Sequence, residues 1–277
     1  ERAVRGLATL RHPCIVPLID FGYLRYESKV SPYLVYEIVA GRPLDVWSRE
    51  IAGHDGMGSR RLQVALKIAD AIEKAHECKY MGNLGFQEQG ILHGDIKPGN
   101  ILVRDVDDHP MVLDFMIPDL QRLIGGRDDL TYWCKKENGT YWYHLPLTAD
   151  FGTPGYMSPE QAVDGIVSPA SDAYSLGQTF LRLFWPVDLM SRTPIPFPLD
   201  YDALRYEAAK DGSADRIENA LAILTAHMTA AQPENRPQRM SDVSERLRAI
   251  EQGTVAPATT SFTAWVAELI MKHLRLR

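Results

Sequence analysis

The segment His93-Gly94-Asp95-Ile96-Lys97-Pro98-Gly99-Asn100 constrains this chain more than any other feature. It places a carboxylate, an ammonium and an amide in one short stretch, and Asp114 adds a second carboxylate 19 residues after Asp95. The apolar residues 101–103 and 111–113 that separate the two carboxylates predict a short β-hairpin. The polar side chains therefore belong to one unit, a loop followed by a hairpin.

These residue types match the requirements of phosphoryl transfer, which depends on positioning and charge neutralisation more than on covalent chemistry. One carboxylate must orient the attacking hydroxyl and accept its proton. A cation must lie near the transferred phosphate, and an amide together with a second carboxylate must hold Mg²⁺. Asp95, Lys97, Asn100 and Asp114 supply these groups in that order. The sequence thus predicts a phosphoryl-transfer site that uses Mg²⁺.

The same residues resemble the catalytic loop and the metal-binding motif of eukaryotic-type (Hanks-type) Ser/Thr protein kinases. The resemblance implies that Asp95 is the catalytic base, that Lys97 contacts the γ-phosphate, and that Asn100 and Asp114 bind Mg²⁺. The wording of residues 12–22 and 152–161 is most similar to bacterial members of that family. Phe115 and His93 correspond to hydrophobic-spine positions.

Further motifs extend the resemblance from about residue 3 to residue 250. Residues 152–160 resemble the substrate-docking loop and the motif that ends in a glutamate, here Glu160. Residues 171–177 resemble the start of the central helix of the large lobe, and Arg236 stands where the family pairs an arginine with that glutamate. Ser/Thr specificity is implied by Lys97 and by Thr153 in the docking loop.

Residues 33–39 resemble the hinge that receives adenine. By this likeness Glu37 and Val39 bind ATP, Tyr36 is a bulky gatekeeper, and Leu102 contacts the adenine from below. ATP and a protein substrate are the partners that the resemblance implies.

The expected fold class is α+β, a two-lobe kinase-like fold with a truncated N-terminal lobe and a mostly α-helical C-terminal lobe. The expected domains are a partial N-lobe (1–39), the C-lobe (40–251), and a linker with an amphipathic helix (252–277). Hydrophobic periodicity predicts the individual elements. These are helices over 1–11, 60–76, 174–184, 217–228, 241–250 and 262–277, strands over 14–21 and 33–39, and a loop over 77–89.

An insertion lengthens the segment between Asp114 and Glu160. Within it, residues 131–143 are rich in aromatic side chains and predict a β-hairpin with Asn138-Gly139 at the turn. Two interpretations stay open. The aromatic side chains either pack onto the large lobe or form a lid or a docking surface for a partner protein.

Three positions and one missing segment depart from the family's pattern. Ala3 stands where the resemblance leads us to expect a glutamate, Gly94 replaces an arginine, and Met116 replaces a glycine. The glycine-rich loop and the strand with the ATP-binding lysine are expected before residue 1. The literal Asp-Phe-Gly at 150–152 lies 55 residues after Asp95, too far for the metal ligand, so Asp114 is preferred.

Composition excludes several classes of function. The net charge of −6 and the absence of a basic stripe argue against a nucleic-acid-binding protein. Three widely spaced cysteines form neither a zinc motif nor a disulfide framework, which favours a reducing, cytoplasmic environment. No apolar run approaches the ~20 residues that span a bilayer, so no membrane insertion of this segment is expected.

Three functions compete at this level. The first is an active Ser/Thr protein kinase, favoured by Asp95, Lys97, Asn100 and Asp114. The second is a pseudokinase that acts as a binding or regulatory scaffold, suggested by Ala3, Met116 and the aromatic insertion. The third is a small-molecule kinase of the aminoglycoside-phosphotransferase type, which shares the His-Gly-Asp wording but has no docking loop like residues 152–160.

Overall fold

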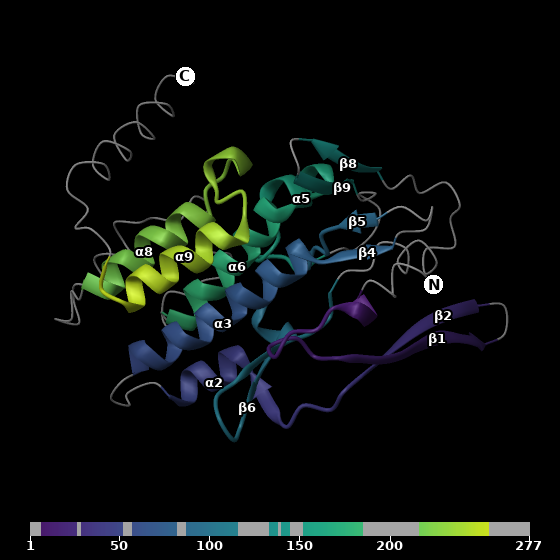
Figure 1. Ribbon diagram of the computed structural model, residues 1–277, viewed down its shortest axis with the longest axis horizontal. Helices are drawn as coiled ribbons and strands as arrows, with labels where there is room; N and C mark the ends of the chain where they lie inside the picture. Colours follow the sequence, from purple (N-terminus) through teal and green to yellow (C-terminus); the bar gives the residue numbers. More distant parts are fainter. Residues whose placement is uncertain are drawn as a thin grey trace.

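The computed structural model describes residues 7–26, 29–51, 57–81, 87–115, 133–137, 140–144, 152–184 and 216–254. Figure 1 shows a body of helices from which one two-stranded ribbon, β1–β2, extends. Several sequence-based expectations lie outside the described residues: those for Ala3, for Met116, for Asp150 and for the helix at 262–277. No helix in the described ranges is long and apolar enough to cross a bilayer.

The helices predicted over 60–76, 174–184, 217–228 and 241–250 are confirmed, with small shifts of their ends, and the structure adds two short helices at 44–50 and 159–164. The helices are α2 (Leu44–Glu50), α3 (Met57–Glu77), α5 (Pro159–Asp164), α6 (Pro169–Phe184), α8 (Arg216–Met228) and α9 (Met240–Glu251). Helix α6 begins five residues before the predicted start, because Ser168 and Pro169 form its first turn. The Ser168 Oγ accepts a hydrogen bond from the Ser171 N–H at 3.2 Å, and a proline suits the first helical position.

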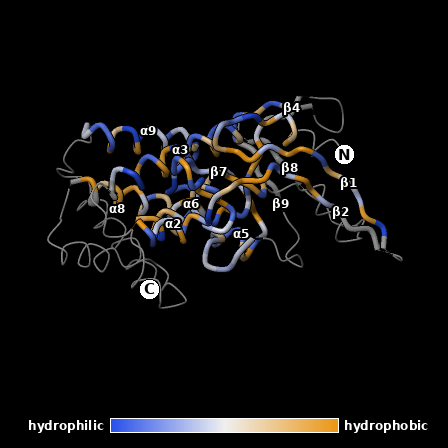
Figure 2. Tube along the Cα trace, turned by 90° about the horizontal axis from the view of Figure 1, so that it is seen from below, coloured by the Kyte–Doolittle hydropathy of each residue, from blue (hydrophilic) through white to orange (hydrophobic). Residues whose placement is uncertain are grey.

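The core lies where α3 packs against α9 and α6. The buried face of α3 carries Leu62, Ala65, Ile68, Ala69, Ile72 and Ala75. Its alanines are small enough to let neighbouring backbones approach, and hydrophobic and hydrophilic residues alternate along α3 in Figure 2, as one buried face requires. Helix α6 is buried over nearly its whole length and therefore forms the centre of the body.

The ribbon pairs β1 (Leu18–Tyr26) with β2 (Lys29–Tyr36) in antiparallel register. The strand predictions over 14–21 and 33–39 were wrong at their ends. Residues 14–17 do not join the ribbon. Instead the Val16 N–H donates to the Val112 oxygen, and the Val112 N–H donates to the Cys14 oxygen. Both strands extend beyond their predicted ends, β1 as far as Tyr26 and β2 from Lys29. This outer part of the ribbon faces solvent, so its residues show no hydrophobic periodicity from which a strand could be predicted.

The remaining strands are short. β3 (Gly41–Pro43), β6 (Ile101–Arg104) and β7 (Pro110–Val112) form one sheet, which confirms the predicted hairpin after Asn100. Residues 77–89, predicted as a loop, contain the paired strands β4 (Lys79–Met81) and β5 (Gln87–Gln89). Their polar residues lack the alternation from which a strand is predicted.

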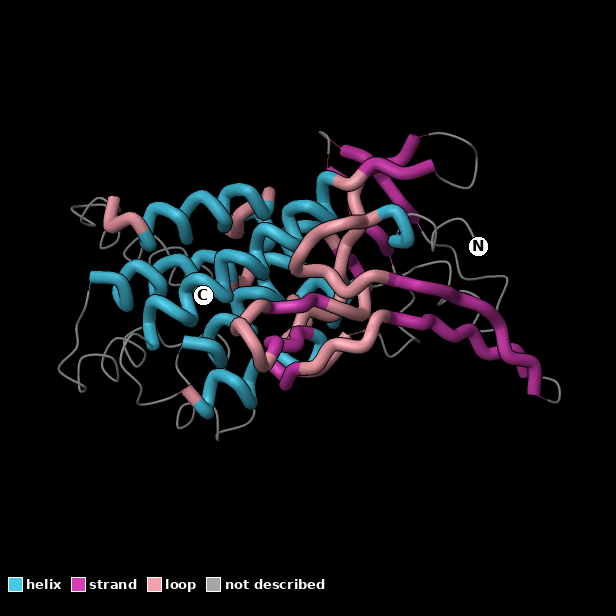
Figure 3. The backbone as a smooth tube through the Cα atoms, turned by 60° about the horizontal axis from the view of Figure 1, so that its bottom comes forward, coloured by secondary structure: helices cyan, strands magenta, loops and turns pink. Residues whose placement is uncertain are grey.

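The predicted hairpin in the insertion is confirmed at the backbone level. β8 (Trp133–Glu137) pairs with β9 (Thr140–His144), with Glu137 opposite Thr140. A third strand, β10 (Ile166–Val167), pairs with β9 directly before α6. Loop segments lie between this sheet, the β1–β2 ribbon and the helical body (Figure 3). Among the residues outside helices and strands are Asp95, Lys97, Asp114 and Thr153.

Gly177 shows how tightly α6 is packed. A Cβ at this position would lie 2.7 Å from the Thr229 Cγ2 and 2.8 Å from the Met228 Cβ. Gly177→Ala is therefore expected to lower the free energy of unfolding by about 1–2 kcal/mol, because overpacking outweighs the gain in helix propensity. Denaturant unfolding followed by circular dichroism measures this change.

Gly99→Ala is the matched control, since nothing lies within 4 Å of its added Cβ. Equal stabilities of the two variants would contradict the packing argument.

Candidate active site

Asp95 lies at the centre of a polar triangle. The Lys97 Nζ donates to the Asp95 Oδ2 at 2.6 Å and to the Thr153 Oγ1 at 2.7 Å. The Thr153 hydroxyl in turn donates to the Asp95 Oδ1 at 2.8 Å. The triangle joins the catalytic-loop segment to the docking loop, since Thr153 lies 58 residues after Asp95 in the sequence. Both carboxylate oxygens of Asp95 are thereby fixed, and about a quarter of its side chain stays exposed.

Asn100 and Asp114 lie side by side at the base of the β6–β7 hairpin. The Asn100 Nδ2 donates to the Asp95 backbone oxygen at 2.9 Å and to the Asp95 Oδ2 at 3.3 Å. The Leu113 N–H donates to the Asn100 backbone oxygen at 3.1 Å, which places the next residue, Asp114, beside Asn100. Within the described residues the Asp114 carboxylate has no hydrogen-bond or ion-pair partner.

Asp114 has a left-handed backbone with φ of 65°. Aspartate tolerates this region better than most residues, but the conformation is strained and such strain concentrates at functional sites. The chain before it is held by His93, whose Nε2 lies 3.1 Å from the Leu113 oxygen. The backbone that carries the exposed Asp114 carboxylate is thus held by its neighbours.

The hydrogen-bond partners of the His93 ring indicate which of its two nitrogens carries the proton. Its Nε2 faces a carbonyl oxygen, so this nitrogen donates, and its Nδ1 accepts from the Asp95 N–H at 3.3 Å. Burial lowers the pKa of His93, while the nearby carboxylates of Asp172, Asp95 and Asp114 raise it. The neutral ring packs against Phe115 with centroids 4.6 Å apart.

Asp172 on α6 holds the backbone of the catalytic loop at His93 and Gly94. Its Oδ2 accepts from the His93 N–H and its Oδ1 from the Gly94 N–H, both at 2.8 Å, and the His76 Nε2 lies 2.8 Å from the Oδ2. Burial alone would raise the pKa of Asp172, but the hydrogen bond and charge of His76, with His93, hold it below its usual value. Gly94 has φ of 74°, which glycine adopts without strain.

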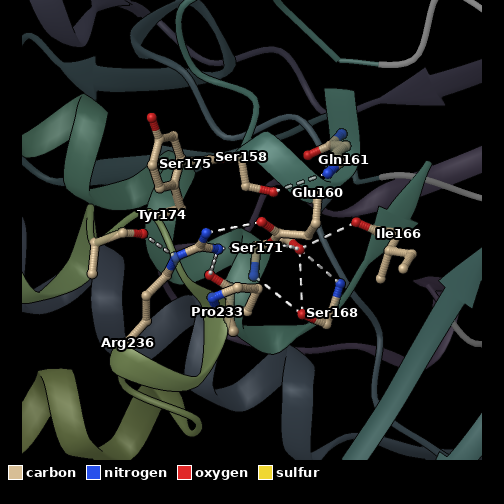
Figure 4. A network of polar contacts seen from close by, with 12 residues as sticks. Ser158, Glu160, Gln161, Ile166, Ser168, Ser171, Tyr174, Ser175, Pro233 and Arg236 are labelled. Carbon is tan, nitrogen blue, oxygen red and sulfur yellow. Dashed lines mark hydrogen bonds and ion pairs between the residues drawn. The ribbon is translucent and has the colours of Figure 1, made fainter. Parts of the chain in front are cut away.

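A second buried network fixes the end of the docking loop (Figure 4). Arg236 binds Glu160 through two parallel contacts, Nη1 to Oε1 at 2.7 Å and Nη2 to Oε2 at 2.8 Å. Ser171 also donates to the Glu160 Oε1 at 2.8 Å. Burial would raise the pKa of Glu160, but the Arg236 hydrogen bonds and charge hold it below its ordinary value. The structure thus brings together the two residues paired in the sequence.

The residues expected at the adenine site come from the segment after β2 and from β6. Glu37 and Val39 follow β2, and the Glu37 N–H donates to the Pro17 oxygen at 3.1 Å. Leu102 is half-buried in β6 between its partners Pro43 and Met111. The Tyr36 hydroxyl is buried without a hydrogen-bond partner among the described residues, and burial followed by the charge of Asp114 raises its pKa to about 12.

The donor set beside Asp95 suits a hard cation. The Asn100 nitrogen is engaged by Asp95, which leaves the amide oxygen and the Asp114 carboxylate as the oxygen ligands that Mg²⁺ prefers. The described part of the chain contains no group of three or more His, Cys, Asp or Glu arranged to hold a metal ion. Mg²⁺ commonly binds through one or two protein ligands together with water and substrate phosphates, a number that Asn100 and Asp114 would supply.

Sequence reasoning missed two positioning contacts. No sequence motif assigns a role to His76, whose Nε2 lies 2.8 Å from the Asp172 Oδ2. Gln161 donates to the Gly94 oxygen at 2.8 Å and so links α5 to the catalytic loop. Neither residue belongs to a pattern from which its partner could be inferred, because the contacts join positions more than sixty residues apart.

The buried Arg236–Glu160 pair generates a stability prediction. Glu160→Gln leaves the guanidinium buried without its counter-charge and should lower the free energy of unfolding by about 3–5 kcal/mol at pH 7. Because the pKa of Glu160 is lowered on folding, the wild-type advantage is present above the unfolded pKa of about 4.3 and is lost as the pH falls through the folded value.

Urea unfolding at several pH values measures both effects. Glu245→Gln on α9 serves as the control for loss of one surface carboxylate. A difference between wild type and Glu160→Gln that does not change with pH would contradict the ion-pair argument.

The comparisons with known proteins agree with this geometry. Residues 2–247 match the family described as protein kinase domain. The chain is 29% identical to the serine/threonine-protein kinase PksC of Streptomyces coelicolor over 187 residues, which cover 66% of this chain and 28% of PksC. It is 28% identical to PknB of Mycobacterium leprae over 259 residues, 91% of this chain and 36% of PknB.

The DNA damage-responsive serine/threonine-protein kinase RqkA of Deinococcus radiodurans is 29% identical over 183 residues, 66% of this chain and 22% of RqkA. The chain therefore spans about a third or less of the length of these relatives. The family match covers most of the chain and includes every residue of the site described above. This chain belongs to the protein kinase family.

Proposed function

We propose that this chain is the catalytic part of a Ser/Thr protein kinase that transfers the γ-phosphoryl group of ATP to a protein hydroxyl. One observation carries the proposal: the Asp95 carboxylate is fixed between Lys97 and Thr153, with Asn100 and Asp114 beside it. The relatives PksC, PknB and RqkA are named as serine/threonine-protein kinases, which supports the same activity.

Each residue has a distinct task in this reaction. Asp95 orients the substrate hydroxyl and accepts its proton as the new oxygen–phosphorus bond forms and the bond to the ADP oxygen breaks. The Lys97 ammonium compensates the negative charge around the transferred group. Mg²⁺, held by Asn100 and Asp114, would neutralise the phosphate oxygens. Glu37, Val39 and Leu102 contact the adenine.

The docking loop supports a protein substrate over a small molecule. The Tyr156 N–H and the Met157 N–H both donate to the Thr153 oxygen, at 3.0 and 3.2 Å, so residues 153–157 form a tight turn next to Asp95. The Ser175 hydroxyl of α6 donates to the Tyr156 oxygen at 2.9 Å and holds this turn on the body. A fixed turn beside the base provides a surface along which a peptide can lie.

The proposal predicts the effect of two conservative substitutions in the full-length protein. Asp95→Asn removes the base and Asp114→Asn removes the charged metal ligand, and each should reduce phosphate transfer by about 10²–10⁴-fold. Transfer of labelled phosphate from ATP to a mixture of Ser- and Thr-containing proteins measures this loss.

Asp242→Asn, on the surface of α9, is the control for an unrelated carboxylate and should keep wild-type activity. Equal transfer by wild type, Asp95→Asn and Asp114→Asn would show that the activity does not come from this site.

A nucleotide-binding pseudokinase is the second candidate, because Ala3 stands where the family resemblance leads us to expect a glutamate. Such a protein would bind a fluorescent ATP analogue, with binding weakened by Asp114→Asn, and would transfer no phosphate to any substrate. Mg²⁺-dependent transfer by the purified full-length protein would rule out this alternative.

A further inference from the structure

Arg182 on α6 is a half-buried cation directly beneath the docking loop. Its guanidinium lies 4.1 Å from the centre of the Tyr156 ring, and its Nη1 donates to the Gln178 oxygen at 2.9 Å. Burial lowers the pKa of Arg182, against a smaller opposing effect of the Tyr156 and Tyr174 hydroxyls. No carboxylate within the described part of the chain is in ion-pair distance of this arginine.

Two other buried arginines show why this arrangement is unusual. Arg236 is matched by the Glu160 carboxylate, and Arg61 is enclosed at 3% exposure with its guanidinium on the backbone oxygens of Ser48 and Phe184. Among the described residues Arg182 has neither a counter-charge nor a full set of carbonyl acceptors. Desolvating a cation without a counter-charge is unfavourable, so an anion supplied from outside these residues would stabilise it.

Gly155 leaves the guanidinium open on the side of the docking loop. A Cβ at Gly155 would lie 3.9 Å from the Arg182 Nη2, so a side chain there would cover that nitrogen. Gly155 also has φ of 86°, a conformation that disfavours any side chain. At Gly155 the docking loop therefore places no side chain over the Arg182 Nη2.

The distance to the site of phosphate transfer is short. Thr153 contacts Asp95, and the Thr153–Tyr156 turn keeps the ends of that segment within about 7 Å of each other. An extended peptide advances ~3.3 Å per residue. A substrate whose hydroxyl lies at Asp95 would thus place a side chain two or three residues away over Tyr156 and Arg182.

We propose that Arg182 selects substrates with an anionic group within three residues of the phosphorylated Ser or Thr. The group is a carboxylate or a phosphoryl, since both accept paired hydrogen bonds from a guanidinium. Tyr156 positions Arg182 by stacking on it. The inference rests on the proposed function, because it names the substrate class of that same site.

Peptides with one central serine test the inference with the full-length protein. The flanking positions, three on each side, carry alanine or, one at a time, aspartate, phosphoserine or lysine. Wild type should use the best aspartate peptide with a kcat/KM about tenfold above the alanine peptide. The phosphoserine series shows whether a phosphoryl group is the stronger ligand.

Three substitutions of Arg182 separate its charge from its packing. Arg182→Gln should bring the aspartate and alanine peptides to within about twofold, Arg182→Glu should favour lysine peptides, and Arg182→Lys should keep part of the acidic preference. The control is Arg239→Gln, which removes a surface cation paired with Asp242 and should keep the wild-type order. An acidic preference that persists in Arg182→Glu overturns the inference.

Equilibrium binding of the same peptides, labelled with a fluorophore and followed by anisotropy, separates this inference from the proposed function. Acidic peptides that bind wild type more tightly than Arg182→Glu, without phosphate transfer to any peptide, would support Arg182 as the anion site and contradict the kinase activity. Phosphate transfer to all peptides without an acidic preference would support the kinase activity and contradict Arg182 as the anion site. Thermal melts of each variant confirm that the fold is kept.

Discussion

The buried Asp172 carboxylate is the interaction on which the rest of the site depends. It is 0% exposed and accepts from the backbone of His93 and Gly94 while His76 contacts it from α3. A buried carboxylate is tolerated only when its oxygens are matched in this way. Because α6 is the centre of the body, this single side chain ties the catalytic loop to a helix that is buried over nearly its whole length.

Through His93, Asp172 also influences the positions of Asp95 and Asp114, the residues proposed to take part in phosphate transfer. His93, held at its backbone, uses one ring nitrogen for the Leu113 oxygen and the other for the Asp95 N–H. Both neighbours of the reaction centre, Asp95 and Asp114, are therefore aligned by one neutral imidazole. Such preorganisation is what phosphoryl transfer requires, since positioning supplies most of the catalysis.

The sequence was sufficient for the family, the main helices and the grouping of Asp95, Lys97, Asn100 and Asp114. Local patterns carried these inferences: apolar periodicity for α3 and a fixed spacing across one hairpin for Asp114. The ends of β1 and β2, the strands within 77–89 and the role of His76 could not be inferred. They depend on tertiary pairing, and a polar strand or a lone histidine has no periodic signal of its own.

The β1–β2 ribbon illustrates how much support a short element takes from the core. A two-stranded ribbon is marginal by itself, but Phe21, Leu34 and Tyr36 pack on the core cluster. Its other face exposes Leu24, Tyr33 and Val35, and hydrophobic residues are visible along both strands in Figure 2. The inner face alone therefore fixes where the chain leaves β2 toward Glu37.

The strand β10 has a consequence for the entropy of the long segment between Phe115 and Gly152. By pairing with β9 it attaches the β8–β9 hairpin to the residues directly before α6. The hairpin therefore closes its own loops, and its strand pairing offsets the entropic penalty of doing so. The insertion lengthens the polypeptide between Asp114 and Thr153 at a small penalty, because each doubling of a loop adds only about 0.6 kcal/mol to its closure.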